Sequence, residues 1–216
     1  ENKKSVHVIP MTDRLDSLTP PGNNLAFCLS TEKLLGVEIP DRANALRVIM
    51  CELSRIASHL VWLGTHALDI GAMTVFLYCW REREMILDLN EEISGVRMMT
   101  SYIRVGGVAK DATRPWLDGI RDFIDYFPAK VDEYERLLTR NPIWLDRTEG
   151  VGVFTREEAI DWSLSGPALR ASGVNWDIRK SHPYSGYDNY KFDVPVFKNG
   201  DIYDRYRVRV EEMRQS

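Results

Sequence analysis

Apolar residues recur at intervals of three and four along much of the chain, which is the period of an amphipathic helix. The pattern is clearest after Asp41 and predicts a long helix from there to Gly71, which ends or bends it. A second helix is expected to continue to about Ser94. The apolar positions of the first are Leu46, Ile49, Met50, Leu53, Ile56, Ala57, Leu60, Leu63 and Ala67.

Two further helices follow from apolar spacing and end signals. Residues 113–140 predict a long amphipathic helix that Pro128 should kink and Asn141-Pro142 should stop. A helix over about 23–35 is expected to be ended by Gly36. The stripe of the longer helix is Trp116, Ile120, Phe123, Ile124, Phe127, Val131, Tyr134 and Leu138.

The N-terminal and middle segments are less regular. Residues 1–22 predict an extended entry and a turn, and residues 102–107 predict a short strand or loop. Thr155 is expected to cap a short helix that residues 165–167 end.

The last part of the chain is predicted to be rich in loops. In residues 172–200, the stretch 191–196 alternates like an edge strand that tolerates proline. Residues 206–216 favour a helix. The chain does not open with Met and its last residues carry no helix stop, so we expect an interior piece of a longer protein. The pattern predicts a mainly α fold, with residues 1–216 as one helical domain and a β-containing part at about 172–200.

Composition and motifs limit the functions that the chain can be expected to have. The apolar share is 44%, the charged share is 28% and the formal charge is −4, which favour a folded core and argue against a nucleic-acid partner. Three scattered cysteines, Cys28, Cys51 and Cys79, predict reduced thiols. The chain has no Cys-x-x-Cys, no His-x-x-x-His and no glycine-rich nucleotide loop. We therefore expect no metal, cluster or nucleotide to be bound by this chain alone.

Residues 56–80 form a long apolar run whose one formal charge is Asp69. The run is long enough to span a bilayer, but its hydroxyls, histidines and carboxylate favour two helices buried on nearly all sides. A carboxylate among apolar neighbours would have a raised pKa. Asp69 could therefore be functional, or it could lie at a helix C-terminus or in an ion pair with Arg55 or Arg104.

Other polar residues have simpler interpretations. His59 and His66 are seven apart, which is not the spacing of a helical zinc pair, so core histidines with satisfied hydrogen bonds are expected. The run Arg81-Glu-Arg-Glu84 indicates a solvated helix face.

Several short sequence motifs occur in order from about residue 10 to the end of the chain. They are Asp-Arg-Leu-Asp (13–16), Glu-Lys-Leu-Leu (32–35), Thr-His-Ala-Leu-Asp-Ile-Gly-Ala-Met-Thr (65–74), Arg-Glu-Arg-Glu (81–84), Tyr-Ile-Arg-Val-Gly-Gly-Val (102–108), Leu-Arg-Ala-Ser-Gly (169–173), Asp-Ile-Arg-Lys (177–180), Phe-Asp-Val-Pro (192–195) and Val-Glu-Glu-Met-Arg-Gln-Ser (210–216). Together they resemble the D-subunit family of respiratory complex I, the large quinone-side component of NADH:quinone oxidoreductase. The resemblance implies the helical core of nickel–iron hydrogenase large subunits, with small β and loop additions.

The resemblance also implies a function shared among several chains. NADH and FMN would act elsewhere in the complex, and a 4Fe–4S cluster in a small partner subunit would pass electrons to quinone in a cavity beside this chain. The C-type subunit and the membrane-arm subunits are the other implied partners, and quinone reduction would drive proton translocation. The implied location is the peripheral arm, on the cytoplasmic face of a bacterial inner membrane or the mitochondrial matrix side, without a membrane span in this chain.

Three residues match positions that carry function in that family. Asp69 matches an aspartate at the quinone cavity that couples reduction to proton transfer, and Thr65 would lie on the same wall. Arg14 matches an arginine near the terminal cluster, where a permanent cation would stabilise the reduced cluster.

Two positions depart from the family pattern. Ser17 stands where the family has a tyrosine that hydrogen-bonds the quinone head group, and a serine hydroxyl reaches several ångströms less far. Met99 stands where the family has a histidine facing the cluster, so a titratable partner is missing.

These departures keep other functions open. The chain could be a divergent paralogue or the large subunit of a membrane-bound, energy-converting hydrogenase. A non-catalytic helical scaffold for assembly is the remaining alternative.

Overall fold

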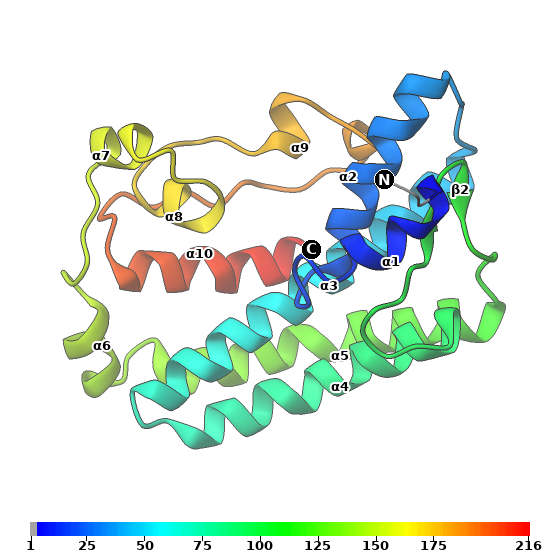
Figure 1. Ribbon diagram of the computed structural model, residues 1–216. Helices are drawn as coiled ribbons and strands as arrows, with labels where there is room; N and C mark the ends of the chain where they lie inside the picture. Colours follow the sequence, from blue (N-terminus) through cyan, green and yellow to red (C-terminus); the bar gives the residue numbers. More distant parts are fainter. Residues whose placement is uncertain (1–3) are drawn as a thin grey trace. The chain divides into compact units, whose positions relative to one another are not determined.

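The computed structural model describes residues 4–216 and is mainly helical, as the sequence predicts (Figure 1). Its α-helices are α1 (Ile9–Thr12), α2 (Pro20–Leu35), α3 (Asp41–Asp69), α4 (Met73–Ser94), α5 (Arg114–Leu138), α6 (Pro142–Thr148), α7 (Arg156–Asp161), α8 (Gly166–Ala171), α9 (Ile178–Ser181) and α10 (Ile202–Gln215). Short 3₁₀ helices are η1 (Ser5–His7) and η2 (Tyr187–Asn189). The strands β1 (Ile103–Arg104) and β2 (Gly107–Val108) pair antiparallel as a hairpin.

The chain forms two compact units. The first comprises Glu1–Val61 and Cys79–Asp125, and the second comprises Trp62–Tyr78 and Tyr126–Ser216. Helices α3, α4 and α5 contribute residues to both.

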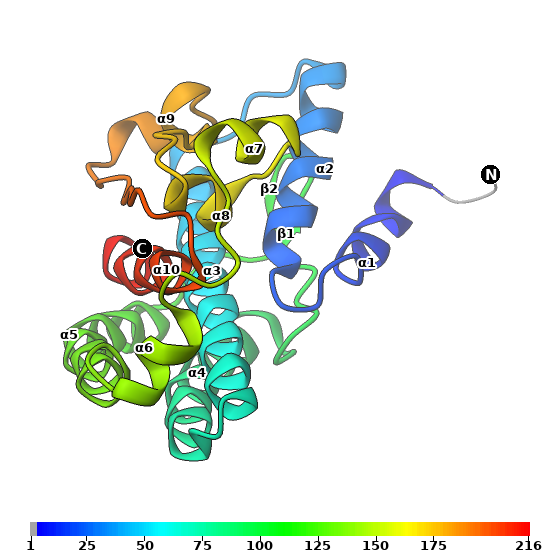
Figure 2. The same ribbon diagram turned by 90° about the vertical axis from the view of Figure 1, so that its left-hand side faces the viewer.

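In the first unit, α2 packs against α1 and against β1 (Figure 2). A buried ion pair fixes the hairpin: the guanidinium of Arg47 donates to both carboxylate oxygens of Glu32, at 2.5 and 3.1 Å. Arg47 also donates to the carbonyl oxygens of Arg104 (2.7 Å) and Gly107 (3.0 Å), and the amide of Gly106 donates to Glu32 (2.8 Å). Both charges are therefore matched and hydrogen-bonded, as burial requires.

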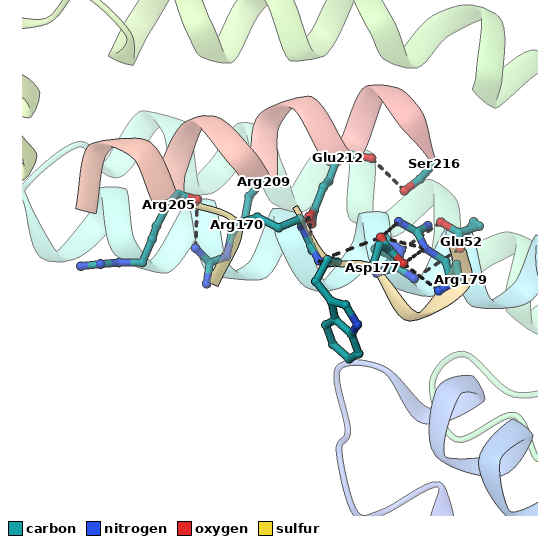
Figure 3. Close-up of polar contacts among 10 residues, drawn as sticks. Glu52, Arg170, Asp177, Arg179, Arg205, Arg209, Glu212 and Ser216 are labelled. Atoms are coloured by element: carbon teal, nitrogen blue, oxygen red, sulfur yellow. Dashed lines mark hydrogen bonds and ion pairs between the residues drawn. The ribbon is translucent and has the colours of Figure 1, made fainter. Parts of the chain in front are cut away.

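In the second unit, α8 packs on α10 and α7 contacts α8. Figure 3 shows Arg170 of α8 facing Glu212 of α10, and this pair is almost fully buried. Nε of Arg170 donates to Oε1 of Glu212 at 2.9 Å, and Nη1 donates to the carbonyl of Trp176 at 3.1 Å. Beside them Asp177 caps α9 and pairs with Arg179 (2.7 Å). One long-range ion pair, Arg170–Glu212, and one local pair, Asp177–Arg179, thus hold this loop-rich part.

The long predicted helices are confirmed. Helices α3, α4 and α5 occupy the expected ranges, and α2 ends at Gly36, whose φ of +66° is the left-handed conformation of a helix C-cap. The stripe of α5 is buried except for Ile124, which is 58% exposed. The capped helix after Thr155 and the helix at the end of the chain are confirmed as well.

Three predicted boundaries are wrong near prolines. Within residues 4–22 the chain forms η1 and α1 rather than an extended entry, and α2 begins at Pro20. Proline suits the first helical positions because its missing N–H would have no partner there. For the same reason Gly166-Pro167 begins α8 rather than ending α7, and Asn141 caps α6, a helix that was not predicted.

The predicted edge strand at 191–196 is also wrong. These residues adopt no regular secondary structure, and the described strands belong to the hairpin in the first unit. Alternation of side chains alone makes no strand, because a strand needs a neighbour to satisfy its backbone groups.

The apolar run at 56–80 is less buried than predicted. Leu60, Leu63, Ala67, Val75 and Cys79 are buried, whereas Thr65, Leu68, Asp69, Met73 and Leu77 are exposed. The run therefore has one buried side and one exposed side. Within the described residues, none of the helices has the length and hydropathy needed to cross a membrane.

Candidate functional site

A buried hydrogen-bond network joins the motif at 13–16 to Ser101, the residue before the motif at 102–108, in the first unit. Asp13, which is fully buried, accepts hydrogen bonds from Nδ2 of Asn24 (2.6 Å), from the amide of Ser101 (3.1 Å) and from the Ser101 hydroxyl. Thr12 donates to the Asn24 oxygen at 2.6 Å. Ser101 has a φ of +42°, a conformation that non-glycine residues seldom adopt. The network therefore holds the segment that carries Arg14 and Ser17 against the segment that carries Met99.

A small cavity of about 20 Å³ lies where these two segments meet. Ser17, Leu18 and Met98 line it together with Arg83 and Asn90 of α4. The structure thus brings Ser17 together with Met98, the neighbour of the predicted Met99.

Arg14 and Met99 lie beside this cavity in the chain but are not among its lining residues. Arg14 is exposed, donates a hydrogen bond to the carbonyl of Pro10 and has no ion pair with a carboxylate in the described part of the chain. Met99 is half-buried.

The charged run 81–84 is not a solvated face, and that prediction is wrong. Glu82 is fully buried and Arg83 is 8% exposed, while only the outer pair at 81 and 84 faces solvent. Helical spacing from the buried Cys79 carried the signal, because positions three and four residues later lie on the same face. Arg83 is the residue of the cavity that sequence reasoning missed.

Thr65 and Asp69 lie in the second unit, at the end of α3. Both are exposed, and a spacing of four places them on one helix face. Asp69 is the last residue of α3 and has no hydrogen bond or ion pair within the described residues, so the predicted pair with Arg55 or Arg104 is absent from that part of the chain. The predicted burial of Asp69 is wrong. Its place at the helix C-terminus agrees with the plainer alternative.

A larger cavity of about 210 Å³ is lined in part by the three residues that follow Asp69 in the sequence. Ile70, Gly71 and Ala72 line it from the turn between α3 and α4, and Asn141 and Trp144 line it from the start of α6. The cavity therefore lies against one side of this turn.

His66 is not the satisfied core histidine that was predicted. Its ring stacks on Trp62 (5.0 Å between centroids) and meets the edge of Trp144 (5.4 Å), but its buried Nε2 has no hydrogen-bond partner among the described residues. Burial lowers the pKa of His66, and the charge of Arg209, which lies over Trp62, lowers it further. Arg205 acts in the same direction, while Asp69 opposes it. His59, by contrast, is buried as predicted.

The lowered pKa of His66 predicts that acid destabilises the chain. The unfolded state, with an ordinary histidine pKa near 6.5, binds a proton before the folded state does, so stability falls as pH drops below about 6.5. His66→Phe should reduce this loss between pH 7 and pH 5 in urea unfolding, because it removes the titrating group. His182→Phe, at an exposed position, is the control and should leave the pH dependence unchanged. Equal pH dependence in the native chain and the His66 variant would contradict the prediction.

Residues able to bind a metal are not grouped in the structure. Among residues 4–216 there is no cluster of three or more His, Cys, Asp or Glu side chains placed to hold an ion.

Comparison with known proteins shows the protein family of the chain. Residues 69–216 match the family model described as respiratory-chain NADH dehydrogenase, 49 Kd subunit. The chain belongs to this family, and the resemblance stated from the ordered motifs is confirmed.

Relatives match over the whole chain. It is 57% identical over 216 residues to the D 2 subunit of NADH-quinone oxidoreductase from Chloroflexus aurantiacus, of which it covers 53%. It is 55% identical to the corresponding D subunit from Geotalea uraniireducens and 57% identical to the D 2 subunit from Koribacter versatilis, of which it covers 55% and 54%. All 216 residues are aligned in each case. The chain spans about half the length of these curated relatives.

Proposed function

We propose that this chain forms one wall of a quinone-reduction cavity in a proton-translocating NADH:quinone oxidoreductase. The observation that carries the proposal is the Asp13 network, which holds the segment of Ser17 against the segment of Met99. In the family that the chain resembles, these positions face the quinone head group and the terminal cluster.

The second unit supports the proposal through the end of α3. Thr65 and Asp69 are exposed on one face, and the Asp69 carboxylate, which has no partner among the described residues, is accessible to a ligand. This accessibility distinguishes it from the buried aspartate that the sequence suggested.

The reaction is the reduction of a quinone by two electrons and two protons to a quinol. The 4Fe–4S cluster of the small partner subunit would supply the electrons when bound beside this chain. Asp69 would hold a proton and pass it toward the quinone side, Thr65 would line the wall, and Ser17 would face the head group. Arg14, an exposed cation, would face the negative charge of the cluster, and Met99 would lie near it without titrating.

The proposed assembly assigns the remaining steps to other chains. NADH oxidation and FMN belong elsewhere in the complex, and the C-type subunit and the membrane arm are the further partners. The chain would lie in the peripheral arm, on the cytoplasmic or matrix face of the membrane.

Asp69→Asn in the intact complex tests the proposal. Asparagine keeps the shape of the side chain but cannot carry a proton, so quinone reductase activity and coupled proton pumping should fall by about 100-fold or more. NADH oxidation by an artificial acceptor that takes electrons before the quinone should be unchanged. The measurement is the rate with each acceptor, together with the pH gradient in vesicles.

The matched control is Asp161→Asn, because Asp161 is exposed and also ends a helix, α7. It should leave all three measurements unchanged. If Asp69→Asn behaves like the control, Asp69 has no role in coupling and the scaffold alternative gains support.

A further inference from the structure

Arg83 is a buried cation without a counter-ion. It is 8% exposed, and in the described part of the chain it makes no hydrogen bond and no ion pair. The ring of Trp80 lies 5.7 Å from its guanidinium carbon. The buried Nε of Arg83 has no hydrogen-bond partner in that part of the chain, and a buried donor without a partner is costly.

The neighbouring charges do not compensate Arg83. Glu84 is adjacent in sequence, but its carboxylate is bound by Arg97, whose guanidinium also pairs with Asp88 at 3.0 Å. Burial accordingly lowers the pKa of Arg83, with Arg97 adding to the effect and Glu84 opposing it. A negative or strongly polar group from a bound ligand would give this donor a partner and stabilise the charge.

The cavity beside Arg83 limits what this group is. Its volume of about 20 Å³ holds one oxygen-sized group. Two other polar lining residues already have partners, because Asn90 donates to the carbonyl of Arg97 (3.3 Å) and Ser54 donates to that of Leu18 (3.5 Å). A carboxylate that paired through both its oxygens would need more room. Arg83 and Ser17 are left to bind one oxygen atom.

We propose that Arg83 and Ser17 form a subsite for one oxygen of the quinone head group, in which Arg83 donates the hydrogen bond. This inference rests on the proposed function. The short side chain of Ser17 leaves the cavity open where the resembled family has a tyrosine, and Arg83 lines the same cavity from α4. A cation is the stronger donor here, because the quinone oxygen gains negative charge as electrons arrive.

The test uses Arg83→Gln in the intact oxidoreductase. Glutamine keeps a donor but loses the charge, so kcat/KM for a short-chain ubiquinone and for a short-chain menaquinone analogue should fall by about 10- to 100-fold. Turnover with an acceptor that takes electrons before the quinone should stay within twofold. Arg121→Gln is the control, because Arg121 is an exposed arginine of α5 paired only on the surface, with Asp118 at 3.1 Å.

Two further variants separate a subsite from a structural role. Arg83→Lys keeps the charge and should recover part of the lost quinone affinity. In the Ser17→Tyr variant a second hydrogen-bond donor is present. Adding Arg83→Gln to that variant should therefore lower the quinone kcat/KM much less than Arg83→Gln does in the native protein. This dependence on residue 17 is not expected if Arg83 only stabilises the fold.

Three outcomes would overturn the inference. The first is a quinone kcat/KM within twofold of the native value. The second is an equal loss with both acceptors in the glutamine and lysine variants, which would assign Arg83 to assembly. The third is an equal loss of quinone kcat/KM on Arg83→Gln in the native protein and in the Ser17→Tyr variant. If Asp69→Asn impairs quinone reduction but Arg83→Gln does not, the proposed function stands without this subsite. If neither variant changes the rate of quinone reduction, the proposed function itself is rejected.

Discussion

Arg47→Ala is expected to lower the free energy of unfolding by about 3–5 kcal/mol, the range for breaking a buried ion pair. Arg47 is fully buried and holds Glu32 and two carbonyl oxygens of the β hairpin. Removing it leaves a buried carboxylate and two buried carbonyls without those donors. Urea unfolding followed by circular dichroism measures the loss.

The control for this prediction is Arg42→Ala on the same helix. Arg42 pairs with Asp111 at 2.7 Å, but both side chains are more than half exposed, so the unfolding midpoint should hardly move. The double variant Glu32→Gln with Arg47→Met removes both charges and should recover part of the loss, because no unpaired charge remains buried. A loss below about 1 kcal/mol for Arg47→Ala would contradict the importance assigned to this pair.

Gly200→Ala is expected to cost at least about 4 kcal/mol, a loss found only where a specific structural conflict exists. A Cβ at this position would overlap the carbonyl oxygen of Phe154, which belongs to the backbone and cannot rotate away. Gly200 also has a φ of +68° and exchanges backbone hydrogen bonds with Phe154 and Ala171, both at 3.0 Å. The chain therefore passes too close at this point for any side chain.

Gly150→Ala separates the clash from the backbone strain. Gly150 has the same φ of +68°, but nothing lies within 4 Å of the position that its Cβ would take. Its substitution should cost only about 1–2 kcal/mol, the cost of a left-handed backbone. Thermal unfolding of the two variants compares them directly, and equal losses would show that the contact with Phe154 relaxes freely.

The long helices could be predicted because their signal is local. Apolar spacing in α3 and α5 and the glycine after α2 depend only on neighbours within a turn or two. The failures occur where a local signal has two meanings. Proline starts a helix as readily as it ends one, which is why α1 and α8 were missed, and alternation at 191–196 makes no strand without a neighbouring strand.

The candidate site shows the same division. The resemblance selected Arg14, Ser17, Thr65, Asp69 and Met99 from the order of short motifs along the chain. Arg83 was missed because the charges of the run 81–84 suggest a solvated face, although its spacing from Cys79 places it on the buried side of the helix.

By itself, the sequence determined the class of fold, the family and the main helices, because periodicity, caps and ordered motifs are properties of the linear chain. Only the tertiary structure decided which charges are buried and which are matched. Among the described residues it pairs Glu32 with Arg47, gives Arg83 no carboxylate partner and exposes Asp69 at the end of α3. Burial and pairing depend on contacts between residues far apart in sequence, and the free energy of a charge depends on both.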